Sequence, residues 1–536
     1  MKQAIYIIAA LLLAAGLEAQ SLSRVWVPDL GDGNYKNPVI NADYSDPDAI
    51  RVGDDYYMIS SSFTQTPGLP ILHSKDLVNW TLIGHALKQI VPIDHFKKVQ
   101  HGGGVWAPSI RYHKNEFYIY YPDPDFGIYL IKASSINGPW TDPLLVEKGK
   151  GLIDPCPLWD DNGKVYLVHA YAGSRAGIKS IFVVKELNNE GTKVISDPVM
   201  VYDGHEKDPT IEGPKFYKRN GYYYIFAPAG GVSTGWQTVL RSKNVYGPYE
   251  RKVVMDQGST SINGPHQGAW VDTRTGENWF LHFQDIDAYG RVVHLQPMKW
   301  INDWPVIGAD KDGDGKGEPV LVHKKPNVGK SYPIITVPDS DEFNSVQLGK
   351  QWQWQANPKE GWVYPTSNGS LRMFAVYQPD SIKGLWDLPN ILAQKIQGDD
   401  SYHCTIKFSF FPKTEGERFG LVIVGLDYAA LSVVKKKDGN YIVFTHCKNA
   451  DKNSEPVDSV IKKITGNEIR FRIDFEEGAT ADLFKYSIDN KQADDIPFVF
   501  TMKPGKWVGA RIGMFYTRSA ITNDGGYVDV DWFRFD

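Results

Sequence analysis

The most constraining feature of the sequence is a β-hairpin pattern that occurs five times. Each copy opens beside a Pro or Gly and continues as a short apolar strand. It then turns on a polar stretch rich in Gly, Asp and Asn and returns as an aromatic strand, which is typical of a hairpin. The copies are "SDPDAIRVGDDYYMISSS" (45–62), "WAPSIRYHKNEFYIYYPD" (106–123), "DPCPLWDDNGKVYLVHAY" (154–171), "EGPKFYKRNGYYYIFAPA" (212–229) and "HQGAWVDTRTGENWFLHF" (266–283).

A second strand pair follows each hairpin, so the repeat has four strands and recurs at about fifty residues, the spacing of β-propeller blades. We therefore predict an all-β fold with a five-bladed β-propeller over residues 25–325. The first strand of each blade runs along the central channel of a propeller. Asp46, Asp154 and Glu212, at equivalent places in three blades, are expected to meet there. Pro47 and Pro155 are expected to hold the two aspartates in extended geometry.

The pattern changes after the fifth repeat. Residues 326–340 contain several prolines and little periodicity, and we interpret them as a linker. Residues 341–536 contain short alternating segments such as "YHCTIKFSFF" and "YVDVDWFRF", which predict an antiparallel β-sandwich. This second domain could bind sugar, brace the propeller, or do both.

The N-terminus predicts export. Lys2 precedes an apolar run that is too short to span a bilayer, and residues 1–19 match a secretory signal peptide. We expect the periplasm, with secretion as the alternative, and no membrane association after cleavage. The net charge of −5 argues against a nucleic-acid partner. Of the three cysteines, Cys404 and Cys447 could pair, but free thiols are an equal alternative.

Three converging carboxyl groups suggest hydrolysis of a glycosidic bond with inversion. That reaction needs a protonated carboxyl for the leaving oxygen and an ionised one for water, about 6.5–9.5 Å apart. Glu212 is the better acid, since apolar neighbours and the other carboxylates should raise its pKa. Asp46 suits the general base. Asp154 would adjust the pKa of Glu212 and orient it.

These motifs resemble glycoside hydrolase family 43. The matching stretches are "DYSDPDAIRVGDDYYMISSSF", "VWAPSIRYH", "IDPCPLWDDNGKVYLV", "IEGPKFYKRNGYYYIF" and "GPHQGAWVD". The resemblance implies a five-bladed propeller and an inverting exo-enzyme for arabinose- and xylose-containing plant polysaccharides. It places the base at Asp46, the pKa modulator at Asp154 and the acid at Glu212. The C-terminal part resembles the concanavalin-like sandwich of the family's β-xylosidase and arabinofuranosidase branches.

The resemblance also implies substrate-binding residues. It places Arg291 on hydroxyls of the terminal sugar and His266 near the catalytic centre, where it could help to hold a hydrated calcium ion; an ion-pair role for Arg291 and a purely structural role for His266 are the alternatives. Trp106 and Phe63 are candidates for packing against the sugar, although core packing is what most aromatic residues do. No cofactor is expected to be required.

One further stretch has the start of a calcium-binding loop. "ADKDGDGKGEP" (309–319) supplies aspartates at alternate positions but has Leu321 where such a loop needs a bidentate Glu. We interpret it as a surface turn, with weak metal binding as the alternative.

The sequence thus predicts an exo-acting, inverting glycosidase that releases terminal α-L-arabinofuranosyl residues. A β-D-xylosidase, or an enzyme with both activities, is the alternative. A sugar-binding propeller without catalysis and a fructan-active enzyme that works by retention are more distant hypotheses. The expected partner is an arabinose- or xylose-containing saccharide, with no obligate protein partner.

Overall fold

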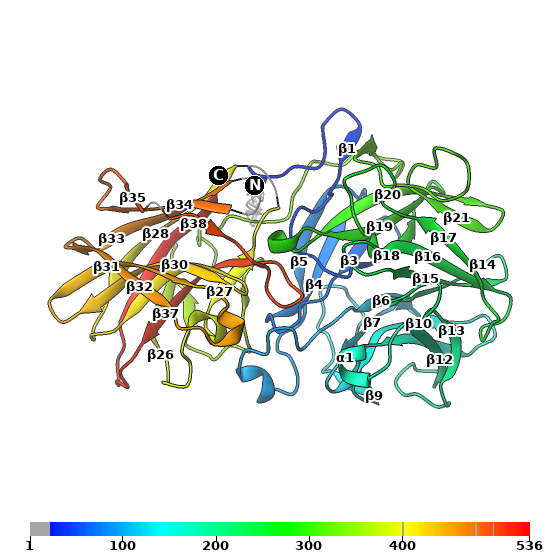
Figure 1. Cartoon of the computed structure of the whole chain (residues 1–536), viewed down its shortest axis with the longest axis horizontal. Helices are drawn as coiled ribbons and strands as arrows, with labels where there is room; N and C mark the ends of the chain where they lie inside the picture. Colours follow the sequence, from blue (N-terminus) through cyan, green and yellow to red (C-terminus); the bar gives the residue numbers. More distant parts are fainter. Residues whose placement is uncertain (1–21, 399–400, 477–479, 497) are drawn as a thin grey trace, which may run out of the picture.

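The computed structural model describes residues 22–398, 401–476, 480–496 and 498–536. The predicted signal peptide, residues 1–19, lies outside this range. The described part is nearly all β and forms two bodies that lie side by side, a five-bladed β-propeller and a β-sandwich (Figure 1). The predicted fold class is therefore confirmed. Within the described residues, no helix is long and apolar enough to cross a membrane.

Each blade is a four-stranded antiparallel sheet made from consecutive strands. Blade 1 contains β2 (Asp48–Val52), β3 (Asp55–Ile59), β4 (Gly68–Ser74) and β5 (Trp80–Leu87); blade 2 contains β6 (Ser109–His113), β7 (Glu116–Asp123), β8 (Gly127–Ala133) and β9 (Leu144–Lys148); blade 3 contains β10 (Leu152–Trp159), β11 (Val165–Tyr171), β12 (Ile181–Leu187) and β13 (Val199–Asp203); blade 4 contains β14 (Lys215–Arg219), β15 (Tyr222–Ala229), β16 (Trp236–Ser242) and β17 (Glu250–Met255); blade 5 contains β18 (His266–Asp272), β19 (Asn278–Asp285), β20 (Arg291–Ile301) and β21 (Trp304–Ile307).

The first strands of the blades lie next to one another around the axis. Strand β2 contacts both β6 and β18, and β10 contacts both β6 and β14. The apolar faces of adjacent blades pack together, for example Ile153 and Phe182 of blade 3 against Phe216 and Ile225 of blade 4. Aromatic and β-branched side chains favour such half-buried strands, which explains why the repeat is so easily recognised in the sequence.

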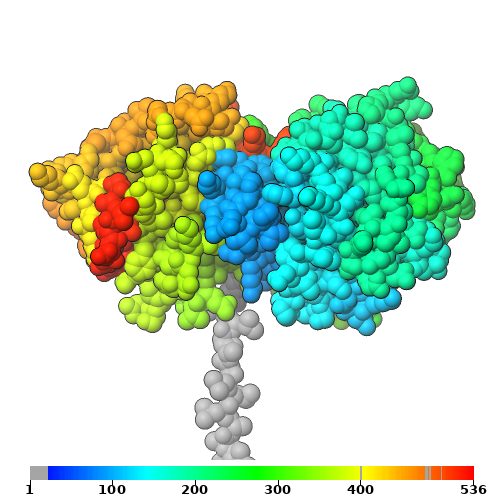
Figure 2. All heavy atoms as spheres, turned by 90° about the horizontal axis from the view of Figure 1, so that it is seen from below, coloured from blue at the N-terminus to red at the C-terminus, as the bar shows by residue number. Residues whose placement is uncertain are grey.

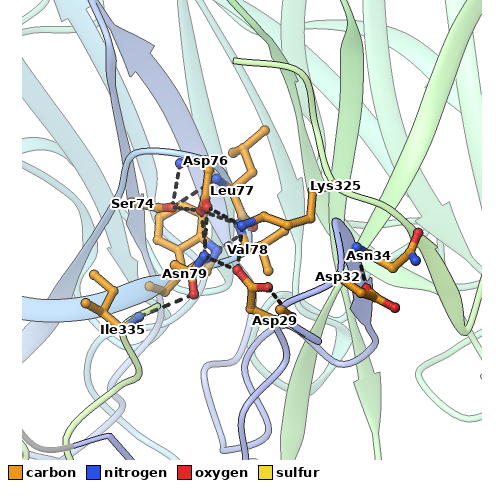
Figure 3. A network of polar contacts seen from close by, with 12 residues as sticks. Asp29, Asp32, Asn34, Ser74, Asp76, Leu77, Val78, Asn79, Lys325 and Ile335 are labelled. Carbon is orange, nitrogen blue, oxygen red and sulfur yellow. Dashed lines mark hydrogen bonds and ion pairs between the residues drawn. The ribbon is translucent and has the colours of Figure 1, made fainter. Parts of the chain in front are cut away.

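The ends of the propeller are joined by a short ribbon and by a polar network. Strand β1 (Asn34–Lys36) pairs with β22 (Val322–Lys324). Just beyond β22, the ammonium group of Lys325 bonds the carboxylates of Asp29 and Asp76, and Asn79 donates to both (Figure 3). The network therefore fixes the N-terminal segment, blade 1 and the segment that leaves blade 5.

The second domain consists of two packed sheets. One contains β23 (Gln353–Trp354), β26 (Val376–Tyr377), β27 (Leu392–Lys395), β29 (Arg418–Val424), β30 (Tyr428–Lys436), β31 (Gly439–Cys447), β32 (Val457–Ile464) and β37 (Arg511–Arg518). The other contains β24 (Val363–Pro365), β25 (Leu371–Phe374), β28 (Tyr402–Phe411), β33 (Glu468–Glu476), β34 (Thr480–Ile488), β35 (Asp494–Ile496), β36 (Phe500–Thr501) and β38 (Tyr527–Phe535). Cys404 and Cys447 lie in different sheets, and all three cysteines are free and buried.

In the part of the chain that the structure describes, helical structure is confined to single turns. They are α1 (Gly173–Ala176), η1 (His95–Lys97), η2 (Asp287–Tyr289), η3 (Leu385–Asp387) and η4 (Ala450–Lys452). Two of them lie at the domain boundary: Ala288 and Tyr289 of η2 pack into the main core of the sandwich, and Trp386 of η3 stacks on His101 with 3.7 Å between ring centroids.

Hydrogen bonds also join the two domains. Thr66 of blade 1 and Trp354 of β23 exchange two backbone hydrogen bonds. The Asn357 side chain donates to the carbonyl oxygen of Ile90 at 2.8 Å. In Figure 2 the blue segment of blade 1 lies between the yellow-green start of the sandwich and the cyan blades. The sandwich is therefore packed on blade 1 at the segments that precede β4 and follow β5.

Candidate active site

The three predicted catalytic carboxyl groups lie at the starts of first strands. Asp46 is two residues before β2, Asp154 lies within β10, and Glu212 is three residues before β14. All three interact electrostatically, because the charges of Asp154 and Asp46 both raise the pKa of Glu212. The propeller thus brings together groups that are far apart in the sequence.

The backbone at the two aspartates differs from the expectation. Asp46 and Asp154 each have a φ of 56°, the left-handed region, whereas the prolines that follow them led us to predict extended geometry. Such a conformation costs about 1–3 kcal/mol for a residue other than glycine. The surrounding chain holds each aspartate in this conformation. Next to Asp46, Ser61 N donates a hydrogen bond to Ser45 O. Asp154 lies where the pairing of β10 with β11 shifts its register, between Ile153 and Cys156.

Asp46 is fixed by two donors. One carboxylate oxygen accepts a hydrogen bond from the Ser61 hydroxyl at 2.7 Å, and the other accepts one from the guanidinium of Arg291 at 3.1 Å. Asp46 is buried. A charged partner and a hydroxyl at opposite oxygens leave the carboxylate little freedom to rotate.

Glu212 is the group whose environment most favours a neutral carboxyl. Burial, followed by the charges of Asp154 and Asp46, raises the pKa of Glu212 to about 8, against the opposing effects of Arg291 and Lys179. Its side chain keeps 35% of its surface exposed, so protein surrounds the carboxyl without sealing it from solvent. A proton donor in a channel needs both properties.

Asp154 is joined to the chain at Glu212 by a hydrogen bond to the backbone. One of its oxygens accepts a hydrogen bond from Gly213 N at 2.7 Å, the amide that directly follows Glu212. Burial, together with the charge of Asp46, raises the pKa of Asp154, while the Gly213 amide opposes this shift. Gly213 has a φ of 60°, which suits glycine at this turn. Asp154 is thus placed to orient the chain at Glu212.

His266 contacts Glu212 as a neutral imidazole. Its Nε2 atom is 3.4 Å from a Glu212 oxygen. Burial, together with the charge of Arg291, lowers the pKa of His266 to about 3, so the contact is not an ion pair at neutral pH. Within the described residues, neither ring nitrogen has a hydrogen-bond partner.

Arg291 occupies the centre of the candidate site and is not a surface residue. It is 8% exposed, bonds Asp46, lies 3.8 Å from Asp285 and packs over the ring of Phe283. It also lines a pocket of about 390 Å³ together with Asp285 and Trp507. We call this region the channel mouth, because Arg291 also bonds Asp46 in the channel. A buried arginine that reaches a pocket can bind hydroxyl groups there.

Trp106 and Phe63 lie together but differ in exposure. Their ring centroids are 6.2 Å apart. Trp106 is partly exposed and donates its indole N–H to Gly102 O at 2.8 Å, whereas Phe63 is 2% exposed and has almost no surface for a ligand. Trp106 is therefore the better placed of the two for contact with a sugar.

Trp507, which we did not predict as a site residue, comes from the sandwich. It lies on the loop between β36 and β37, and its ring centroid is 6.2 Å from that of Trp106. It lines both the pocket with Arg291 and a second pocket of about 260 Å³ that includes Asp123 and Arg175. The sandwich therefore forms part of the channel mouth. A tryptophan in the glycine- and lysine-rich stretch "KPGKWVG" is the sequence signal that could have indicated this.

A second group of charged side chains, Asp48, Arg111 and Lys215, connects the first strands of the blades. Asp48 accepts a hydrogen bond from Arg111 at 2.7 Å, and the ammonium of Lys215 lies 4.0 Å from the same oxygen. These residues come from blades 1, 2 and 4, so the ion pairs connect the blades that carry Asp46 and Glu212.

The acidic turn after blade 5 lies apart from this site. Among the described residues, Asp310, Asp312 and Asp314 are the one group of three acidic, histidine or cysteine side chains close enough to share a metal ion. Asp310 accepts hydrogen bonds from the amides of Gly313 and Gly315, as expected for a surface turn.

A propeller that gathers a glutamate of raised pKa, an aspartate held by two donors and a third carboxyl group has the architecture of a glycoside hydrolase. The family models agree: residues 35–305 match "Glycosyl hydrolases family 43" and residues 340–536 match "Beta xylosidase C-terminal Concanavalin A-like domain". The chain belongs to glycosyl hydrolase family 43 and is a glycosidase.

Its relatives have two kinds of name. It is 39% identical to a putative beta-xylosidase of Xylanibacter ruminicola, over 91% of this chain and 87% of the relative. It is 33% identical to a beta-xylosidase of Formosa agariphila, over 95% and 91%. It is 28% identical to a non-reducing end alpha-L-arabinofuranosidase of Bacteroides ovatus, over 96% and 97%. A solved xylan beta-1,4-xylosidase from Bacillus halodurans has the same fold, with a TM-score of 0.82, 24% identity and coverage of 94% and 99%.

Proposed function

We propose that the protein is an exo-acting, inverting β-D-xylosidase on xylo-oligosaccharides. The observation that carries this proposal is the arrangement of Glu212, whose pKa is raised to about 8, in the same channel as Asp46. One carboxyl that keeps its proton near neutral pH and one carboxylate held by donors are the two groups that inversion requires.

In this mechanism Glu212 donates its proton to the glycosidic oxygen while the bond from that oxygen to C1 breaks. Asp46 takes a proton from a water molecule whose oxygen forms the new bond to C1 from the opposite face, which inverts the anomeric centre. Asp154 keeps Glu212 oriented through Gly213, and its charge opposes early loss of the Glu212 proton. Arg291 and Trp106 bind the terminal sugar. Solvent then returns a proton to Glu212 and removes one from Asp46.

Xylosidase activity is favoured over the arabinofuranosidase activity that we preferred from the sequence. Two full-length relatives at 39% and 33% identity are named beta-xylosidases, and the C-terminal domain matches a model named for beta-xylosidases. The relative named as an arabinofuranosidase supports α-L-arabinofuranosidase activity as the second candidate. Both substrates end in a pentose, so a single pocket could accept both.

Release of 4-nitrophenol from the β-D-xylopyranoside and from the α-L-arabinofuranoside tests the proposal. We expect kcat/KM to be higher for the xyloside, and proton NMR should show that the first-formed xylose is the α-anomer. A higher kcat/KM for the arabinofuranoside would favour the second candidate. Negligible release from both substrates, or a retained anomer, would overturn the proposed mechanism.

We further propose that no cofactor is required. The buried and unpartnered nitrogens of His266 fit a water molecule or a hydrated calcium ion. The calcium ion would add positive charge near the carboxylates. A direct calcium site does not fit, because no group of three suitable ligands surrounds His266 among the described residues. Dialysis against EDTA should therefore leave kcat within threefold of its original value; loss of all activity would contradict this.

Export to the periplasm is also part of the proposal, and the pattern of residues 1–19 supports it. Cell fractionation with immunodetection of the full chain should place the processed protein in the periplasmic fraction. Recovery of the unprocessed chain in the cytoplasm would contradict it.

A further inference from the structure

Asp43 lies at the point where the sandwich meets the strands that carry Asp46 and Arg291. It is three residues before Asp46 and 2% exposed. One of its oxygens accepts hydrogen bonds from Arg291 N and from the Ser45 hydroxyl, each at 3.0 Å. The other oxygen accepts a hydrogen bond from Gly509 N at 3.1 Å and one from the Arg511 guanidinium at 3.4 Å.

The first oxygen of Asp43 organises the propeller side. Tyr44 N donates to Arg291 O at 2.9 Å, and Arg291 N donates to the Asp43 carboxylate, so two hydrogen bonds join residues 43–44 to Arg291. The side chain of Arg291 then returns to Asp46 at 3.1 Å. Residues 43–46 and Arg291 thus form one closed unit, and movement of Asp43 would displace both the proposed base Asp46 and the proposed sugar-binding Arg291.

The second oxygen of Asp43 accepts its hydrogen bonds from the sandwich. Gly509 and Arg511 stand at the start of β37, and Ala510 N donates to Ala288 O at 2.7 Å. A Cβ atom at Gly509 would lie 2.8 Å from the backbone at residues 289–290, and one at Gly290 would lie 2.6 Å from the carboxyl carbon of Asp43. Glycine at these two positions permits the close approach that brings the Gly509 amide onto Asp43.

The charge of Asp43 is matched to its surroundings. Burial alone would raise the pKa of Asp43, but Lys395, Arg511 and the two backbone amides lower it, so the carboxylate stays ionised. Lys395 and Arg511 both come from the sandwich. Burial and the charge of Arg511 lower the pKa of Lys395 well below its ordinary value, so Arg511 is the main positive charge at this position. The ionised Asp43 carboxylate is expected to keep one position, since moving it away from its partners would leave buried charges unpaired.

We propose that Asp43 is a positioning residue through which the sandwich holds Asp46 and Arg291 in their reactive arrangement. The inference rests on the proposed function, because it assigns the sandwich a part in the same hydrolytic site. Asp43 itself touches no reacting atom in this scheme. Its effect passes through the backbone of Arg291 and through residues 44–46.

Substitution on both sides of this link tests the proposal. Asp43→Asn removes the charge with little change of shape, and Arg511→Gln removes the cation on the sandwich side; Arg511 lines neither pocket at the channel mouth. We expect kcat for 4-nitrophenyl β-D-xyloside to fall about tenfold or more in each, since small displacements of catalytic groups are costly. The double variant should be no slower than Asp43→Asn alone, because the two residues act through one link.

Two matched variants separate positioning from loss of stability. Asp76→Asn alters an aspartate that is as buried as Asp43 but belongs to the network around Lys325. It should lower the melting temperature comparably and leave kcat within twofold of the wild type. Arg511→Lys keeps the positive charge and should recover most of the kcat that Arg511→Gln loses.

The proposal is overturned if Asp43→Asn matches Asp76→Asn in kcat, or if the losses of the two single variants multiply in the double variant. If Asp43→Asn fails to fold, the Arg511 variants decide the question. The proposal is then overturned if Arg511→Gln and Arg511→Lys both have the kcat of the wild type. A wild-type enzyme that releases no pentose would instead refute the proposed function. Wild-type turnover with unaffected variants would refute only the role of Asp43.

Discussion

Opposing effects at Glu212 decide its protonation state. Burial and two neighbouring carboxyl groups favour the neutral form, and they outweigh the charges of Arg291 and Lys179. Because Arg291 bonds Asp46 directly, the negative charge of Asp46 offsets part of the effect of Arg291 on the pKa of Glu212. The general base therefore also supports the acid, and the two residues are best tested together.

Glu212→Gln should show a leaving-group effect. The amide cannot donate the proton, so kcat for xylobiose should fall about 10³-fold. The reaction of 4-nitrophenyl β-D-xyloside needs little protonation, so its kcat should fall much less. Steady-state kinetics with both substrates measure the difference. Glu206→Gln, at an exposed position, is the control and should behave as the wild type; equal losses on the two substrates would contradict the role of Glu212 as acid.

The same carboxyl should make stability depend on pH. Its pKa is raised to about 8 in the folded chain from an ordinary value of 4.5. Between these values the unfolded chain releases a proton that the folded chain retains, so the free energy of unfolding falls as pH rises from about 4.5 to 8. Glu212→Gln removes this contribution. Its melting temperature relative to the wild type should therefore rise across that window, and a constant difference would contradict the shift.

The position of a residue in the repeat predicted the site, but its conformation did not follow from its type. Equivalent places at the starts of blades were enough to predict that Asp46, Asp154 and Glu212 converge. The left-handed backbone at Asp46 and Asp154 could not be predicted, since proline in the next position disfavours helical φ/ψ and tertiary contacts override this preference. The near-complete burial of Phe63 likewise depends on neighbours that are remote in sequence.

At the level of elements, hairpins were predictable and closure of the ring was not. Each blade consists of consecutive strands, so its pattern is local in the sequence. The pairing of β1 with β22 joins residues nearly three hundred positions apart, and neither three-residue strand has a pattern of its own. The network at Lys325 reinforces this closure (Figure 3).

Lys325→Met should destabilise the propeller. The ammonium group lies between Asp29 and Asp76, whose side chains are 4% and 3% exposed, and its removal leaves two buried carboxylates facing each other. Breaking one partner of a buried ion pair costs about 3 kcal/mol or more. Thermal unfolding followed by circular dichroism should show a clear fall in melting temperature. The control Lys324→Met, at an exposed neighbour, should not, and equal melting temperatures would contradict the role of the network.

At the scale of the whole molecule, the sequence predicted two domains but not how they join. Alternating strands identified the sandwich, and the question of whether it meets substrate stayed open. The structure places Trp507 of the sandwich at the channel mouth and Tyr289 of the propeller in the sandwich core. Neither contact has a periodic signal, because both residues lie in short irregular segments.

This mutual insertion predicts that the two domains unfold together. Separation would break the paired backbone bonds of Thr66 and Trp354, remove Tyr289 from the sandwich core and strip Asp43 of its sandwich partners, so each domain loses stabilising contacts that it makes only with the other. Differential scanning calorimetry of the full chain should therefore show one endotherm, and saturating xylose should shift all of it upward, because a ligand of the folded state stabilises every part that unfolds with its site. Two resolved endotherms, with xylose moving only one of them, would mean that the sandwich is an independent domain, and the link from Arg511 through Asp43 to the proposed base would then have to be far weaker than its geometry implies.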